Sequence, residues 1–140
     1  MHINYSKLKE TITILSQTEL VSATISLRSD KVIQYSIKDN ITISAKDSSE
    51  MVDTAGKLGH FQKFPILIVG GTHTLADKDA REFGASNEGT KYAIAVAFVI
   101  KSLAQKLLGN AYLKINKPVV PTALFDNEEK AIEWLQKFIK

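Results

Sequence analysis

Two uninterrupted apolar segments constrain the fold of this chain more than any other feature. Residues 64–69 and 92–99 have the length of β-strands and contain no charged side chain. Strands of this composition are buried on both faces, as in the middle of a partly parallel sheet that helices cover. The sequence therefore predicts a layered α/β protein in which these two segments are central strands.

The segment before them alternates apolar and polar side chains. Residues 21–28 and 33–37 both show this period of two, and Ser29-Asp30 between them has the composition of a tight turn. Because neighbouring side chains in a strand point to opposite faces, the alternation predicts an antiparallel hairpin with one buried face. A last short strand is predicted over residues 119–125.

Helices are predicted between and after these strands. Ser44 and Asp77 are suitable N-cap residues, and Asp47 is placed to complete a capping box with Ser44. Asp126 is the expected cap of the last helix, with Glu129 as its capping-box partner. An apolar stripe within residues 100–115 predicts one more helix, which we expect to pack through that stripe.

Together, these elements predict a mixed α/β sheet of about five strands, with an N-terminal antiparallel hairpin and about four flanking helices. Residues 18–140 form the predicted single domain, and residues 1–17 form an N-terminal extension. In the extension, apolar residues fit a helix face over residues 5–15, whereas residues 11–14 alternate as in a strand. We expect a helix there.

The composition is that of one soluble domain. The chain has 140 residues, of which 44% are hydrophobic and 24% charged. No apolar segment has the length of a membrane span, the first residues lack the layout of a signal peptide, and there is no cysteine. We therefore expect a cytoplasmic protein without membrane association. The net charge of +3 arises from scattered lysines, which predicts no nucleic-acid partner.

The glycine-containing segment after residues 64–69 is the predicted functional surface, because ligands of open α/β sheets gather where strands end and helices begin. The segment lacks the known phosphate-binding glycine motifs, and the carboxylates of Asp77 and Asp79 would oppose an anion at this helix start. The candidate partner- or ligand-binding residues are Gly70, Gly71, Thr72, His73, Thr74, Asp77, Lys78 and Asp79.

No group of residues predicts a catalytic centre or a metal site, and we expect no cofactor. His73 with Asp77 or Asp79 would supply an acid and a base or a metal cluster, but His2 and His60 have no ligand-like spacing to them. Ser86 lacks the G-x-S-x-G context of a nucleophile. An enzyme that uses His73 is kept as a hypothesis of the lowest rank.

Five segments carry a family resemblance: residues 64–69, 75–83, 92–99, 108–118 and 121–135. Through them, the chain from about residue 21 to its end is similar to the SpoIIAA-like, or STAS-like, domain superfamily, and most similar to a small bacterial branch of uncharacterised function. The resemblance implies a mixed sheet flanked by helices and a non-enzymatic role. Anti-sigma-factor antagonists of this superfamily bind a partner kinase and are switched by phosphorylation of a serine in an Asp-Ser-Ser-Gly turn.

At the position of that turn, this chain has Asp77-Lys78-Asp79-Ala80. Asp79 stands in place of the phosphorylated serine, and its single charge falls short of a phosphate's charge of about −1.5 to −2. The resemblance therefore implies a regulatory protein-interaction domain without the usual switch, whose partner would be a regulatory kinase or an anti-sigma-like factor. A homodimer is a further expectation, because symmetric dimers are common.

A second hypothesis is a carrier of a small apolar molecule, which the resemblance also allows. The glycine pair at residues 70–71, Leu75, Phe83 and the alanine-rich segment 92–99 would then line a pocket. An exposed patch of Trp134 and Phe138 would instead indicate a surface for a protein partner.

Overall fold

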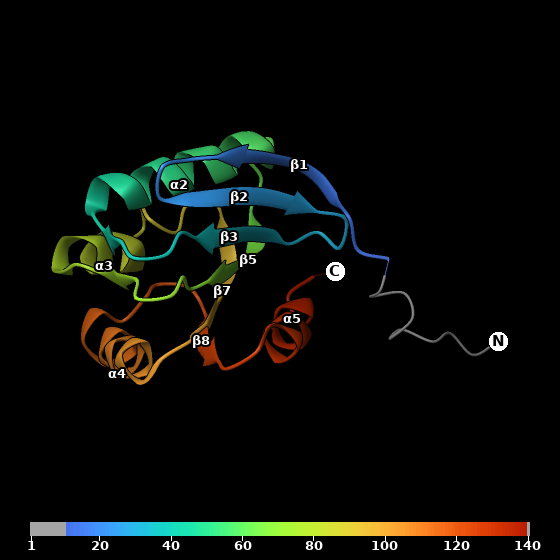
Figure 1. Ribbon diagram of the computed structural model, residues 1–140. Coiled ribbons are helices and arrows are strands. Elements are labelled where there is room, and N and C mark those ends of the chain that lie inside the picture. Colours follow the sequence, from blue (N-terminus) through green and yellow to red (C-terminus); the bar gives the residue numbers. More distant parts are fainter. Residues whose placement is uncertain (1–10, 140) are drawn as a thin grey trace.

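The structure is a computed structural model that describes residues 11–139. Its main sheet has six strands in the order β1-β2-β3-β5-β7-β8 (Figure 1). Pairing is antiparallel from β1 to β3 and parallel from β3 to β8, so the predicted mixed α/β sheet is confirmed. The six strands are β1 (Ile14–Glu19), β2 (Ala23–Arg28), β3 (Ile33–Ile37), β5 (Phe64–Val69), β7 (Ala93–Val99) and β8 (Thr122–Phe125).

Four α-helices and one π-helical turn connect or follow these strands in the described part of the chain. They are α2 (Ala45–Leu58), α3 (Lys78–Ala85), α4 (Leu103–Ala111), the π-helical turn η1 (Tyr112–Asn116) and α5 (Glu128–Gln136). Two short strands, β4 (Thr42–Ile43) and β6 (Leu75–Ala76), pair in parallel beside the main sheet. They bring the segment before α2 next to the segment before α3.

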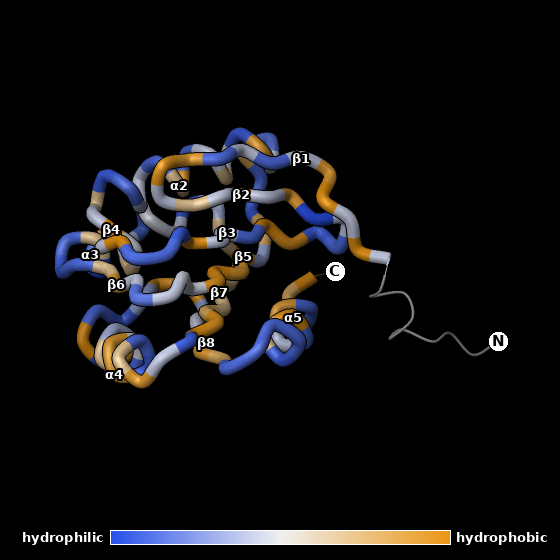
Figure 2. Tube along the Cα trace, in the orientation of Figure 1, coloured by the Kyte–Doolittle hydropathy of each residue, from blue (hydrophilic) through white to orange (hydrophobic). Residues whose placement is uncertain are grey.

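The central strands are buried on both faces, as their composition predicts. In β5, Ile66 belongs to a core cluster with Met51 and Ala55 of α2, whereas the neighbouring Leu67 belongs to a second cluster with Leu135 of α5. Helices α2 and α3 therefore pack on one face of the sheet and α5 on the other. The continuous hydrophobic colouring of β5 and β7 follows from this two-sided burial (Figure 2).

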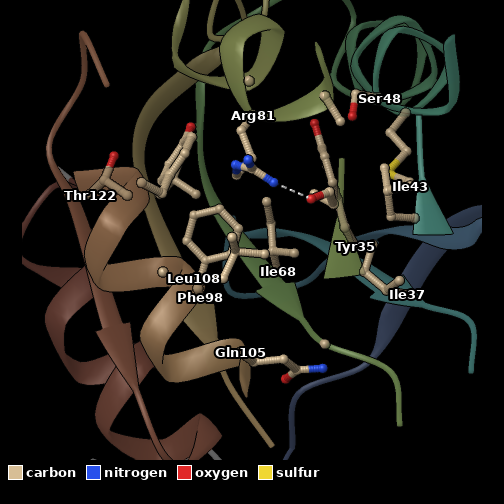
Figure 3. A pocket seen from close by; sticks show the side chains of 18 of the residues that line it. Tyr35, Ile37, Ile43, Ser48, Ile68, Arg81, Phe98, Gln105, Leu108 and Thr122 are labelled. Atoms are coloured by element: carbon tan, nitrogen blue, oxygen red, sulfur yellow. Dashed lines mark hydrogen bonds between the residues drawn. The ribbon is translucent and has the colours of Figure 1, made fainter. Parts of the chain in front are cut away.

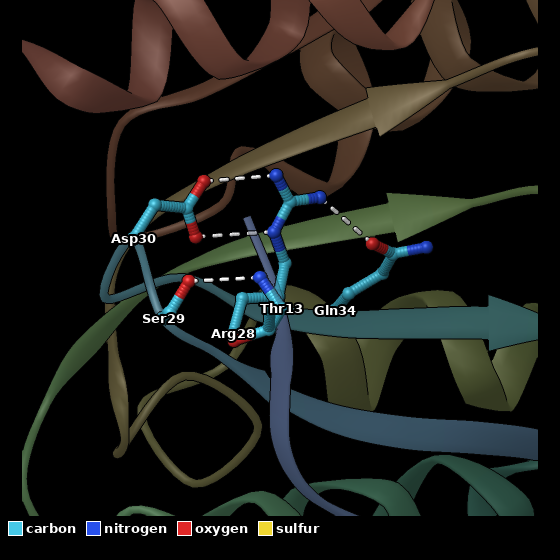
Figure 4. A network of polar contacts seen from close by, with 5 residues as sticks. All are labelled: Thr13, Arg28, Ser29, Asp30 and Gln34. Carbon is cyan, nitrogen blue, oxygen red and sulfur yellow. Dashed lines mark hydrogen bonds and ion pairs between the residues drawn. The ribbon is translucent and has the colours of Figure 1, made fainter. Parts of the chain in front are cut away.

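The predicted hairpin of β2 and β3 is confirmed, and a polar network closes its turn (Figure 4). The guanidinium of Arg28 donates to both carboxylate oxygens of Asp30, at 3.1 and 2.8 Å, and to the side-chain oxygen of Gln34 at 2.9 Å. Lys31 has a φ of 65°, which lets the chain reverse directly after Asp30. The hydroxyl of Ser29 accepts from the backbone N–H of Thr13 and joins β1 to the same turn.

The prediction of a helix within residues 1–17 is wrong for the residues of this range that the structure describes. Residues 1–10 lie outside the described part, but residues from Ile14 onward form β1, which pairs with β2 as a sixth strand. The sheet thus begins inside the segment assigned to an extension. Pairing of β1 with the neighbouring β2 decided the outcome, because all side chains of this edge strand are exposed and its pattern carries no signal of burial.

The helix expected within residues 100–115 is also different from the prediction. Helix α4 begins only at Leu103, and its Leu103 and Leu107 side chains are 70% and 62% exposed. The side chain that α4 buries is that of Gln105. The helix widens into η1 after Ala111, and its C-cap is Lys117, whose φ of 51° lies in the left-handed region, directly before Pro118.

One detail of the last helix needs correction. Its N-cap is Asn127, whose side-chain oxygen accepts from the backbone N–H of Lys130 at 2.9 Å, and not Asp126. Trp134, for which a packing or partly exposed position was expected, is partly buried and packs between Phe125 and Phe138 with ring centroids 5.8 and 4.9 Å away. The caps at Ser44, with its capping box, and at Asp77 are confirmed.

Candidate functional site

A pocket of about 210 Å³ lies between the sheet and the helices α2, α3 and α4 (Figure 3). Its floor is formed by side chains of β3, β5 and β7, and its walls come from the helices, η1 and the segment that precedes α3. The lining is predominantly aliphatic and aromatic, with Ile37, Ile43, Met51, Ile66, Ile68, Leu75, Phe83, Phe98, Leu108 and Leu124 among its apolar members.

Small residues on α3 leave this space open. Ala80 and Gly84 both line the pocket and lie on one face of α3, opposite the large side chains of Ile68 and Phe98 on the sheet. A Cβ atom added to Gly84 would meet only the hydroxyl of Tyr112, at 3.4 Å, within the 4 Å around it. Larger residues at these two positions would occupy the pocket, so the short side chains of α3 determine its volume.

Arg81 is the one charged residue in the lining formed by the described residues. It lies one position after Ala80 on α3, is half-buried, and donates from a terminal guanidinium nitrogen to the backbone oxygen of Ala76 at 2.6 Å. None of the ion pairs among residues 11–139 includes Arg81. The pocket therefore contains a positive charge without a carboxylate partner.

Three of the hydroxyl groups in the lining make no hydrogen bond to the described chain. They belong to Tyr35, Ser48 and Tyr112. Among residues 11–139, the one fully buried hydroxyl without a hydrogen-bond partner is that of Ser22, so the three pocket hydroxyls are not fully buried. The three pocket hydroxyls therefore border on accessible space. Burial raises the pKa of Tyr112 to about 12 and raises the pKa of Tyr35 as well, so both phenols keep their protons at neutral pH and can donate.

Gln105 closes one end of the pocket. Its side-chain nitrogen donates to the backbone oxygens of Gly71 and Thr74, at 2.8 and 2.9 Å, and its oxygen accepts from the backbone N–H of Lys101 at 2.8 Å. On the other side of the segment, the Thr74 hydroxyl donates to the backbone oxygen of Lys38 at 2.6 Å. The glycine-containing segment is thus fixed from two sides.

The predicted site residues divide into two groups. Gly70 and Thr74 line the pocket, and Gly71 is buried directly beside it. Thr72, His73, Asp77, Lys78 and Asp79 are exposed, and none of these five lines the pocket. The side chain of Asp77 accepts from the backbone N–H of Ala80 as the cap of α3, and Lys78 pairs with Glu82 at 3.9 Å on the surface.

The structure also shows the residues considered for a metal site or a catalytic serine. The described residues contain no group of three or more histidine, aspartate or glutamate side chains that could hold a metal ion. The hydroxyl of Ser86 donates to the backbone oxygen of Phe83 and accepts from the N–H of Gly89, and so it completes the turn after α3. No helix within residues 11–139 is long and apolar enough to span a membrane.

Sequence reasoning missed Arg81, Tyr35, Tyr112 and Gln105. Arg81 is one of two arginines among 18 basic residues, and this scarcity was the available signal. Its place on a largely polar helix did not indicate that its side chain would face a pocket. The hypothesis of an apolar pocket did name Leu75, Phe83 and residues of the segment 92–99, and these do line it.

The mixed α/β fold of this chain is similar to the fold described as SpoIIAA-like. The structure is similar to the crystal structure of an uncharacterised protein from the DUF3478 family with a SpoIIAA-like fold, from Shewanella loihica PV-4, with a TM-score of 0.53 and 13% identity over 89% of this chain and 93% of that chain. At 13% identity, this similarity shows a shared fold and carries no information about function. The model of a family described as a domain of unknown function, DUF7793, matches residues 25–139, and the chain belongs to this family.

The other comparisons add little. A protein with unknown function from Arthrobacter sp. FB24 shares 23% identity over 80% of this chain and 97% of that chain, but its TM-score of 0.29 is too low for an argument about structure. No curated protein matches the chain.

Proposed function

We propose that this SpoIIAA-like domain binds a small apolar molecule in the pocket between its sheet and the helices α2, α3 and α4. The observation that carries the proposal is a preformed pocket of about 210 Å³ with a mostly apolar lining and a few convergent polar groups. This combination is typical of ligand sites, whereas well-packed cores contain few voids larger than a water molecule. The proposed role is binding and not catalysis.

The volume of the pocket limits the size of the ligand. A dry cavity of about 150 Å³ holds a molecule such as benzene. The space of about 210 Å³ therefore suits a molecule of roughly eight to twelve non-hydrogen atoms, which is small compared with the ligands of typical binding pockets. Leu75, which lines the pocket and is 41% exposed, marks the side through which such a molecule would enter.

Titration with 1-octanol, followed by NMR of the ¹⁵N-labelled protein, tests the proposal. We expect saturable shifts at the backbone amides of Ala80, Gly84 and Tyr112, which surround the pocket. The variant Gly84→Leu would place a side chain in the same space and abolish these shifts. The matched control Glu82→Leu adds the same side chain to an exposed position of α3 and leaves binding unchanged. Equal binding by both variants, or none by the unmodified protein, would contradict the proposal.

Regulation through a protein partner is a second candidate, which the resemblance to anti-sigma-factor antagonists implies. It is supported by the exposure of His73, Lys78 and Asp79 beside the first turn of α3, where none of the three lines the pocket. The triple variant His73→Ala, Lys78→Ala, Asp79→Ala should then lose a partner that the Gly84→Leu variant still binds. Asp77 is left intact because it caps α3. Retention of every partner by the triple variant would count against this role.

A further inference from the structure

The charge distribution of the pocket identifies the class of ligand more closely. Arg81 contributes a half-buried guanidinium to a lining that, among the described residues, contains no aspartate or glutamate. Removing a cation from water without an opposite charge is costly, and burying an arginine is usually accompanied by a carboxylate or phosphate partner. No such partner exists for Arg81 within residues 11–139, so its half-buried guanidinium is available to an anionic ligand.

We propose that the ligand is a small monocarboxylate, whose carboxylate binds Arg81 while its apolar chain fills the rest of the pocket. This inference rests on the proposed function. A guanidinium has five N–H donors in a planar fork, and the contact with Ala76 occupies a terminal nitrogen only. The remaining donors can hold a carboxylate through two parallel hydrogen bonds, which is the geometry that arginine favours.

The neighbouring polar groups support an anion and oppose a cation. Gly84 follows Arg81 by three residues on α3, and the Tyr112 hydroxyl lies 3.4 Å from the position that a Cβ atom of Gly84 would take, so Arg81 and Tyr112 line the same pocket from neighbouring positions. Tyr35 from β3 and Ser48 from α2 point into the same pocket (Figure 3). These hydroxyls are free to donate to an acceptor. Protonated phenols and a guanidinium together form a polar end that offers donors to an anion.

The carboxylates near Arg81 in sequence do not face the pocket. Asp77 accepts from the backbone N–H of Ala80 and is exposed, and Asp79 and Glu82 are exposed residues outside the lining. They therefore leave the guanidinium available. Asp77 and Asp79 would oppose an anion at the start of α3, as the sequence predicts, but neither residue lines the pocket.

Three eight-carbon probes with different charges test the inference on the unmodified protein. We expect octanoate to bind at least about 10-fold more tightly than 1-octanol, and octylammonium to bind more weakly than 1-octanol, because a charge-assisted hydrogen bond corresponds to roughly 10- to 100-fold in affinity. Equal affinities for octanoate and 1-octanol would overturn the inference and leave the proposed function intact. Failure of all three probes to bind would contradict the proposed function and, with it, this inference.

Variants of Arg81 assign the effect to one side chain. In Arg81→Gln, octanoate should bind about 10- to 100-fold more weakly, whereas 1-octanol should lose much less affinity because its neutral hydroxyl accepts a weaker hydrogen bond. Arg81→Lys keeps the charge but loses the fork, and we expect an intermediate affinity for octanoate. Saturable 1-octanol binding shows that a variant has kept its pocket. A full preference for octanoate in both variants would overturn the assignment to Arg81.

Discussion

The side-chain amide of Gln105 donates to the backbone oxygen of Gly71 at 2.8 Å, although 34 positions separate the two residues in the chain. Through this bond and its partner bond to Thr74, the first turns of α4 hold the segment that follows β5. Gln105 is only 9% exposed, in a helix whose leucines are largely in solvent. A buried polar side chain, and not the apolar stripe, therefore fixes the position of α4 beside the pocket.

Gln105→Leu should destabilise the protein, because it removes three hydrogen bonds and leaves the oxygens of Gly71 and Thr74 without this donor. We expect a loss of about 2–4 kcal/mol in the free energy of unfolding, measured by urea denaturation. The control Leu107→Gln changes an exposed residue of the same helix and should cost less than about 0.5 kcal/mol. Equal losses for the two variants would mean that Gln105 does not hold α4.

Gly71, which is buried beside the pocket, and Gly84, which lines it, should respond in opposite directions to substitution by alanine. At Gly71, a Cβ atom would lie 2.3 Å from the backbone oxygen of Lys38, and we expect a loss of more than about 3 kcal/mol. At Gly84, the nearest atom is the Tyr112 hydroxyl at 3.4 Å, and alanine should stabilise α3 by about 0.5–1 kcal/mol. Thermal unfolding of both variants checks the signs, and a destabilised Gly84→Ala would contradict the packing described.

The contrast between α4 and the central strands shows which parts of the fold were predictable. The strands β5 and β7, the hairpin and the caps at Ser44 and Asp77 depend on local patterns that survive in any context. Which side of α4 is buried depends on contacts between distant segments, and β1 forms by pairing with β2 although its exposed side chains show no pattern of burial. A stripe of leucines predicts burial only if another element covers it, and nothing in the sequence indicated that Gln105 would be buried instead.

The candidate site was predictable to a similar extent. Position in the fold directed attention to the end of β5, since open α/β sheets place ligands there, and Gly70 and Thr74 of that segment line the pocket. Arg81 could not be found in this way, because the direction in which an arginine on a short helix points depends on the packing around it. The same holds for Tyr35 and Tyr112, which the pattern of the sequence presents as ordinary core residues.

The ion pair between Arg28 and Asp30 should stabilise the hairpin turn. The side chains are 13% and 7% exposed and meet through two hydrogen bonds, so Asp30→Asn would leave the guanidinium with a neutral partner. We expect a loss of about 2–3 kcal/mol in urea denaturation. The surface pair of Lys38 and Glu19 provides the comparison: Glu19 is 72% exposed, and Glu19→Gln should have a far smaller effect. A reversed order of the two losses would contradict the assigned burial.

Tyr112 should make the stability of the protein fall at high pH. Burial raises the pKa of its phenol to about 12 in the folded protein, whereas an exposed tyrosine in the unfolded chain titrates near 10. Below pH 10, both states hold the proton and pH has no effect through this group. Between about pH 10 and 12, the unfolded state loses its proton while the folded state keeps it, so the free energy of unfolding decreases as pH rises, by up to about 3 kcal/mol.

Urea denaturation of the unmodified protein and of Tyr112→Phe at pH 9, 10 and 11 measures this contribution. Phenylalanine has no proton to lose, so the variant should lose less stability over this range than the unmodified protein, although Tyr35, whose pKa is also raised by burial, still contributes in both. Absorbance at the phenolate band should show one fewer late-titrating tyrosine in the variant. Parallel pH profiles would mean that the Tyr112 hydroxyl is open to bulk water, and the polar end assigned to the pocket would then lose one of its donors.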